Sequence, residues 1–91
     1  MDFASLPGSE LILEGVLDLE RGRTTPAALL VAIGAKRLRR AGLDVPDVVI
    51  ANPEHELYEL LAREAPDSAH SRYNALVRQL VSFERAAECA V

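Results

Sequence analysis

The sequence predicts an all-α fold, and three observations support that prediction. Proline and glycine divide the chain into four segments, and within them apolar residues recur at the 3.6-residue period of a helix. The one stretch with strand propensity, Val48–Ile50, has no second strand with which to pair. We therefore expect a four-helix bundle-like small domain with a short irregular connector between its second and third helices. A chain of 91 residues is too short for two independent cores, so residues 1–91 are expected to form a single helical domain.

The first two helices have clear end signals in the sequence. The first is expected over about residues 8–21, with Gly22 as its stop. Thr25 is the expected N-cap of the second, and Pro26 suits its first position, where a missing N–H costs nothing. This second helix is expected to continue to about residue 41, because the next glycine and proline lie just beyond it.

The last two helices are separated by Pro66, which disfavours helical geometry at the residue before it. The third helix is expected over about residues 53–65, with Asn52 as its cap. Asp67 or Ser68 is expected to cap the fourth helix, which continues to about residue 88. Its predicted buried face comprises Ala69, Tyr73, Leu76, Val77, Leu80, Phe83 and Ala87.

The second predicted helix has no polar face over its first ten residues. Leu29, Leu30, Val31 and Ile33 point in four directions on a helical wheel, and a helix that is apolar all round must be covered all round. Two solutions are open: the other helices of the same chain cover it, or a second subunit does, most simply in a homodimer. Gly34 inside this helix costs about 1 kcal/mol relative to alanine, which indicates a close helix crossing.

Two charged groups are candidate partner-binding surfaces. The basic run at the end of the second helix consists of Lys36, Arg37, Arg39 and Arg40. The acidic stripe on the first helix consists of Glu10, Glu14 and Asp18, at successive i,i+4 positions. Each also has a purely structural interpretation: cations stabilise a helix C-terminus, and carboxylates commonly form a solvated face that a nearby arginine can pair with. If they bind a partner, each would meet a surface of opposite charge.

Glu84 is the one carboxylate predicted to lie within the apolar sector of the fourth helix. A buried carboxylate needs a partner that compensates for its lost hydration. We therefore expect Glu84 either at the frayed edge of the core or paired with an arginine from another helix or subunit.

The sequence offers one weak catalytic candidate pair, Arg63 and His70, with six residues between them. This spacing is similar to that in the motif of the HEPN-family ribonucleases, small helical bundles in which arginine and histidine are separated by four to six residues. The resemblance implies an alternative function, in which Arg63 and His70 act together on an RNA phosphodiester. It requires the two side chains to converge beside open solvent. His55, the other histidine, is expected to be a partly exposed first-turn residue.

Composition argues against several other classes of function. The net charge of −4 disfavours nucleic acid as a partner, including for a helix-turn-helix DNA reader. A single cysteine, Cys89, excludes an intramolecular disulfide and any multi-cysteine zinc site, and we expect neither metal nor cofactor. The sequence shows no secretory leader and no apolar run long enough to span a membrane, so we expect a cytoplasmic protein. The leading hypothesis is a protein–protein interaction or regulatory module without its own catalysis.

Overall fold

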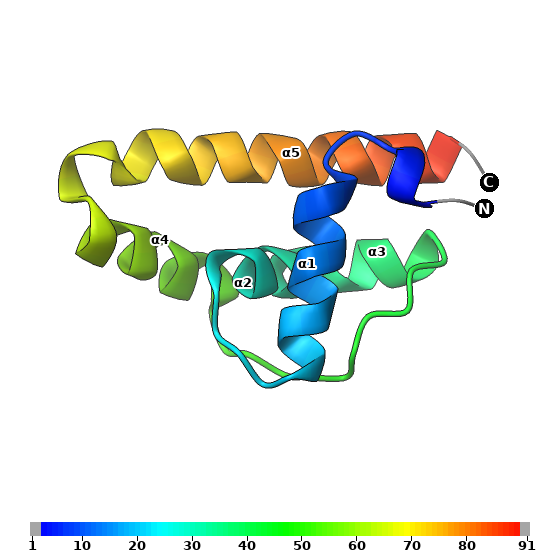
Figure 1. Ribbon diagram of the computed structural model, residues 1–91, viewed down its shortest axis with the longest axis horizontal. Helices are drawn as coiled ribbons and strands as arrows, with labels where there is room; N and C mark the ends of the chain where they lie inside the picture. The colour runs from blue at the N-terminus through cyan, green and yellow to red at the C-terminus, as the bar shows by residue number, and fades with distance from the viewer. Residues whose placement is uncertain (1–2, 90–91) are drawn as a thin grey trace.

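The structure is a computed structural model that describes residues 3–89, and it is all-α, as predicted (Figure 1). Within this range there are five α-helices and two short 3₁₀ turns, and no strand. The α-helices are α1 (Ser9–Glu20), α2 (Pro26–Ile33), α3 (Ala35–Arg40), α4 (Pro53–Glu64) and α5 (Ala69–Cys89). The 3₁₀ turns are η1 (Phe3–Ser5) and η2 (Pro66–Ser68). None of the helices in these residues is both long and apolar enough to cross a membrane.

The longest helix, α5, extends along the length of the molecule (Figure 1). In the same view α4 lies below α5 and is joined to its left end through η2, while α1 crosses α2 at a steep angle. The core between these helices is aliphatic apart from one aromatic ring. Its largest fully buried side chains are Ile12, Leu29, Leu30, Val31, Leu38, Leu57, Leu61 and Phe83.

The predicted second helix is not continuous, because Gly34 divides it into α2 and α3. Gly34 has φ −95° and ψ 10°, outside the helical well, although its N–H still bonds to the Leu30 carbonyl at 3.3 Å. A Cβ on Gly34 would lie 2.9 Å from Leu80 Cδ1 and 2.8 Å from Glu84 Oε2, both on α5. The glycine therefore allows the close helix crossing that the sequence predicted.

A single chain encloses most of the apolar second helix. Leu29, Leu30 and Val31 are fully buried by the other helices, and Ile33 is half-buried. Of the two solutions that the sequence left open, cover by the same chain accounts for the burial of Leu29, Leu30 and Val31, and Ile33 keeps some exposed surface. Small residues explain this result: alanine at positions 27, 28 and 32 and Gly15 on α1 let neighbouring helices approach closely.

The helix ends agree with the predicted signals at three positions. Thr25 caps α2, since its hydroxyl accepts a hydrogen bond from the Ala28 N–H at 3.2 Å. Gly22 and Gly42 both have positive φ, 70° and 104°, and follow α1 and α3 as left-handed terminators.

The predicted caps of the last two helices make no side-chain capping bond. Asn52 occupies the N-cap position of α4, but it lies in the left-handed region at φ 50° and its side chain makes no capping bond. Asp67 and Ser68 belong to η2, and the Ser68 hydroxyl bonds back to the Ala65 carbonyl at 3.4 Å. Pro66 is the reason, because it starts a 3₁₀ turn that leads directly into α5.

The buried face of α5 is largely the predicted one. Leu80 and Phe83 are buried in the core, but Leu76, which was expected to be equally buried, is only partly so. The difference follows from the packing of α5, whose middle is covered less completely than its last three turns.

The connector, residues 43–51, has no regular secondary structure, as predicted. Its first half is anchored, because Leu43 and Val45 are buried in the core. Its second half is not: Val48 is 44% exposed and Val49 is 91% exposed. The connector therefore presents two valines to solvent beside an otherwise well-packed core.

Candidate binding groove

A groove of about 610 Å³ lies between α5, the α2–α3 break, the connector and the start of α4. Its lining comes from three segments that are far apart in sequence. They contribute Ala32, Ile33, Gly34, Ala35, Lys36, Arg37 and Arg40; Val48, Val49, Ile50, Pro53 and Glu54; and Val77, Leu80, Val81 and Glu84. Most of these side chains are aliphatic, so the groove has an apolar floor. Its charged lining residues are Lys36, Arg37 and Arg40 on α3, Glu54 on α4 and Glu84 on α5.

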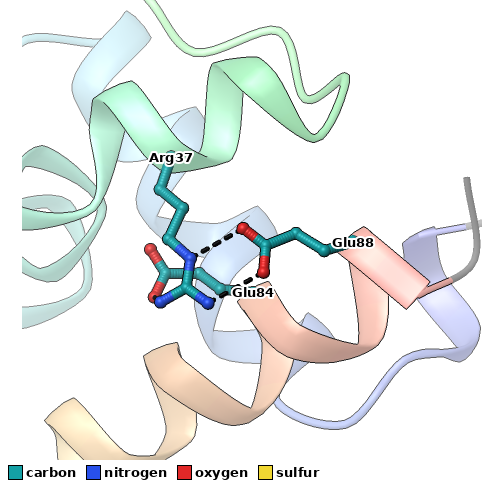
Figure 2. Close-up of polar contacts among 3 residues, drawn as sticks. All are labelled: Arg37, Glu84 and Glu88. Carbon is teal, nitrogen blue, oxygen red and sulfur yellow. Dashed lines mark hydrogen bonds and ion pairs between the residues drawn. The ribbon is translucent and has the colours of Figure 1, made fainter.

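Glu84 is the buried polar group of this groove. Its side chain is only 5% exposed, and Arg37 on α3 approaches it with an Nη1–Oε1 distance of 3.4 Å (Figure 2). The prediction that an arginine from another helix pairs with Glu84 is therefore confirmed. Arg37 also holds Glu88, one turn further along α5, through Nε to Oε2 at 2.7 Å and Nη2 to Oε1 at 2.8 Å. One guanidinium thus joins α3 to α5 through two carboxylates.

The pKa values of the two carboxylates are shifted in opposite directions. Burial raises the pKa of Glu84, and the charge of Arg37 offsets this rise only in part. The hydrogen bond from Arg37 lowers the pKa of Glu88, which lies at the surface. Arg37 therefore stabilises the charged form of Glu88 more effectively than the charged form of Glu84.

Glu84→Gln is expected to increase the free energy of unfolding at pH 7 modestly, because it keeps the shape of the side chain and removes a buried charge, while Arg37 stays paired with Glu88. Since the folded-state pKa of Glu84 is raised, the charge costs stability at neutral pH. That cost disappears as the pH falls through the raised pKa toward the ordinary value of 4.5. The stability difference between the variant and the wild type should therefore shrink over this interval in urea denaturations.

Glu88→Gln is the matched control and should behave in the opposite way. The folded-state pKa of Glu88 is lowered, so its charge contributes stability above the ordinary pKa, and that contribution is lost as the pH falls through the folded-state pKa. The control should therefore be less stable than the wild type at pH 7. A loss of stability in Glu84→Gln that equals the loss in Glu88→Gln would contradict the assignment for Glu84.

The basic run consists of two arginines that make hydrogen bonds within the chain and two cations that make none with residues 3–89. Arg37 holds Glu84 and Glu88, and Arg39 donates hydrogen bonds to the carbonyls of Val45 and Pro46, at 3.3 and 2.8 Å. These two arginines join α3 to α5 and to the connector. Lys36 and Arg40 are exposed, line the groove, and have no hydrogen bond or ion pair with any of residues 3–89. They are the cations of the basic run that remain available to a partner.

The acidic stripe is not one continuous surface. Glu10 and Glu14 are exposed and line a smaller depression at the start of α1. Asp18 is buried, and its Oδ2 accepts a hydrogen bond from the Thr25 hydroxyl at 2.6 Å. Asp18 therefore orients the cap of α2, and only Glu10 and Glu14 are accessible from outside.

Arg63 and His70 do not share a pocket. Arg63, at the end of α4, lines a shallow depression with Glu59 and Ala62 that does not include His70. His70 lies at the start of α5, where its Nε2 is 3.2 Å from the Asn74 amide nitrogen. Both side chains are exposed, and no hydrogen bond joins them in the described part of the chain.

Neither His55 nor Cys89 lines the groove. His55 is exposed in the first turn of α4, as predicted, and its Nε2 lies 3.1 Å from Glu59 Oε1. No group of three potential metal ligands converges within the described residues. Cys89 is exposed, at the end of α5.

The sequence did not reveal the groove, although it contained two signals of it. Gly34 and Glu84 were each singled out as irregular, and they meet at its floor, where Glu84 Oε2 lies beside Gly34. The connector was expected to bury one or two of the side chains of Val48–Ile50, but both valines are exposed and Ile50 is only partly buried. Comparisons with protein-family models, with curated proteins and with solved structures found no match for this chain.

Proposed function

We propose that this chain is a protein–protein interaction module without its own catalysis, and that it binds its partner in the groove. The occupant is a protein segment that carries aliphatic side chains next to a carboxylate. The observation that carries the proposal is the combination of an aliphatic floor with two unpaired cations, Lys36 and Arg40, on one rim.

The two parts of the groove have different tasks in this proposal. Aliphatic side chains on the floor contribute affinity, at about 25 cal/mol for each Å² of apolar surface removed from water. The exposed cations contribute less free energy, about 0.2–1 kcal/mol for each ion pair, but they select partners with negative charge and orient them. Ile33, Val77 and Val81 are only partly buried, so they have apolar surface left to cover.

Selection from a random displayed-peptide library tests this proposal. The wild type should retain peptides that combine aliphatic residues with aspartate or glutamate. Val81→Glu, which places a carboxylate on the groove wall, should lose them. Leu17→Glu is the matched control: Leu17 is an apolar residue of α1 that is 48% exposed and lies outside the groove.

Charge reversal supplies the second arm of the same experiment. Lys36→Glu/Arg40→Glu should retain the aliphatic preference and lose the preference for carboxylates. Thermal unfolding of every variant establishes that it is folded. The proposal would be overturned if no peptide class were enriched, or if Val81→Glu retained the same peptides as the wild type.

A further inference from the structure

The most exposed large apolar side chain among residues 3–89 lines the groove of its own chain. Val49 is 91% exposed and Val48 is 44% exposed, and both belong to the lining of the groove. Exposed apolar groups that gather beside a concave apolar surface commonly mark a contact site. One face of the molecule therefore carries both an apolar protrusion and an apolar groove.

The charges on this face are complementary in the same way. Asp47 immediately precedes the two valines, is exposed, and forms no hydrogen bond or ion pair with residues 3–89. Lys36 and Arg40 of the groove lining likewise form no hydrogen bond or ion pair with residues 3–89, and the charge of Arg40 acts on Glu88 only from a distance. The segment Asp47–Val49 thus has the carboxylate and the aliphatic side chains that the groove is suited to bind.

Hydrogen bonds hold the backbone around this segment in place. Arg39 donates to the carbonyls of Val45 and Pro46, and the Val48 N–H donates to the Pro46 carbonyl at 2.9 Å. These bonds fix the backbone immediately before and within the segment. A segment that is ordered before binding loses little conformational entropy when it binds.

We propose that the occupant of the groove is a second copy of this chain, with Asp47–Val49 of each copy in the groove of the other. This inference rests on the proposed function and names the partner. Because protrusion and groove lie side by side on one face, a two-fold axis between them makes both contacts at once, as an isologous interface requires. Asp47 of one copy then faces Lys36 and Arg40 of the other, and each contact occurs twice.

Sedimentation equilibrium of the full chain across the micromolar range tests the association. The wild type should rise from 9.9 kDa toward twice that mass as the concentration increases. Val49→Asp should weaken dimerisation about 100-fold, because two valines lose their apolar contacts in one dimer. Leu17→Asp, at an apolar position that is 48% exposed and lies outside the groove, should dimerise like the wild type.

A charge exchange tests the proposed pairing. Asp47→Lys and Lys36→Glu/Arg40→Glu should each weaken the dimer about 10-fold by removing the opposite charges. When the three changes are combined in one chain, opposite charges face each other again, and dimerisation should be restored. A merely structural role of these exposed residues would not produce this rescue.

Two results would overturn the second-copy inference. One is a mass near 9.9 kDa at every concentration, and the other is a dimer that neither Val49→Asp nor the charge changes weaken. Peptide selection by the groove would remain a separate result in both cases. If the chain is monomeric but retains aliphatic–acidic peptides, the proposed function holds and only the identity of the partner is wrong. If it does neither, both proposals fail.

Discussion

Phe83→Ala is expected to lower the free energy of unfolding by about 3–5 kcal/mol, the range for truncating a buried aromatic ring. Phe83 is fully buried on α5, and its ring centroid lies 6.1 Å from that of Phe3. It is the largest of the fully buried side chains, in a core that is otherwise aliphatic. The loss would remove a large share of the roughly 5–15 kcal/mol that stabilises a typical small domain.

Urea denaturation followed by circular dichroism measures this loss. Phe83→Leu is the matched control, because it keeps the site apolar and removes less volume, so it should lose clearly less stability than the alanine variant. An alanine variant with the denaturation midpoint of the wild type would mean that α5 does not pack through this residue.

Local rules predicted most of the helical structure from the sequence. Thr25 followed by Pro26 is a start signal that a few neighbouring residues define completely, and α2 begins there. The stop at Gly22 has the same local character, because only a residue that tolerates positive φ suits the position. Such signals depend on one or two turns of backbone, so they can be recognised in the sequence without knowledge of the tertiary contacts.

The errors arise where distant segments meet. Asp18 was assigned to an exposed stripe from its spacing, but it is buried beside Thr25, seven residues away. Gly34 was recognised as a close crossing, yet the break between α2 and α3 depends on the passage of α5, which the local sequence does not describe. The apolar residues on every side of the second helix correctly predicted that it is buried. They could not indicate whether the same chain or a second copy covers it.

The candidate site was only partly predictable for the same reason. Glu84 stood out because a carboxylate in an apolar sector needs a partner, and the partner, Arg37, belonged to a run that was already under consideration. The groove itself is formed by three segments whose contact depends on the whole fold. The sequence ranked Lys36, Arg37, Arg39 and Arg40 equally, whereas the structure separates two cations that hold the fold from two that remain unpaired.

The crossing of α1 over α2 depends on Gly15. This glycine is buried, and a Cβ built on it would overlap the Ala27 carbonyl and lie 2.5 Å from Val31 Cγ2. The Ala27 carbonyl is backbone, so it can move away only if the two helices separate. At Gly34, by contrast, the atoms that a Cβ would meet belong to the side chains of Leu80 and Glu84, which can adjust.

Gly15→Ala is therefore expected to destabilise the fold by about 1–3 kcal/mol or more, the usual cost of overpacking. Helix propensity alone predicts the opposite sign, since alanine inside a helix is favoured over glycine by about 1 kcal/mol. The sign of the change in a denaturation experiment thus separates the two effects directly. Gly34→Ala should lose less stability than Gly15→Ala, because side chains rather than backbone must move. If Gly15→Ala were more stable than the wild type, α1 and α2 would have to cross with more space between their backbones than the structure shows.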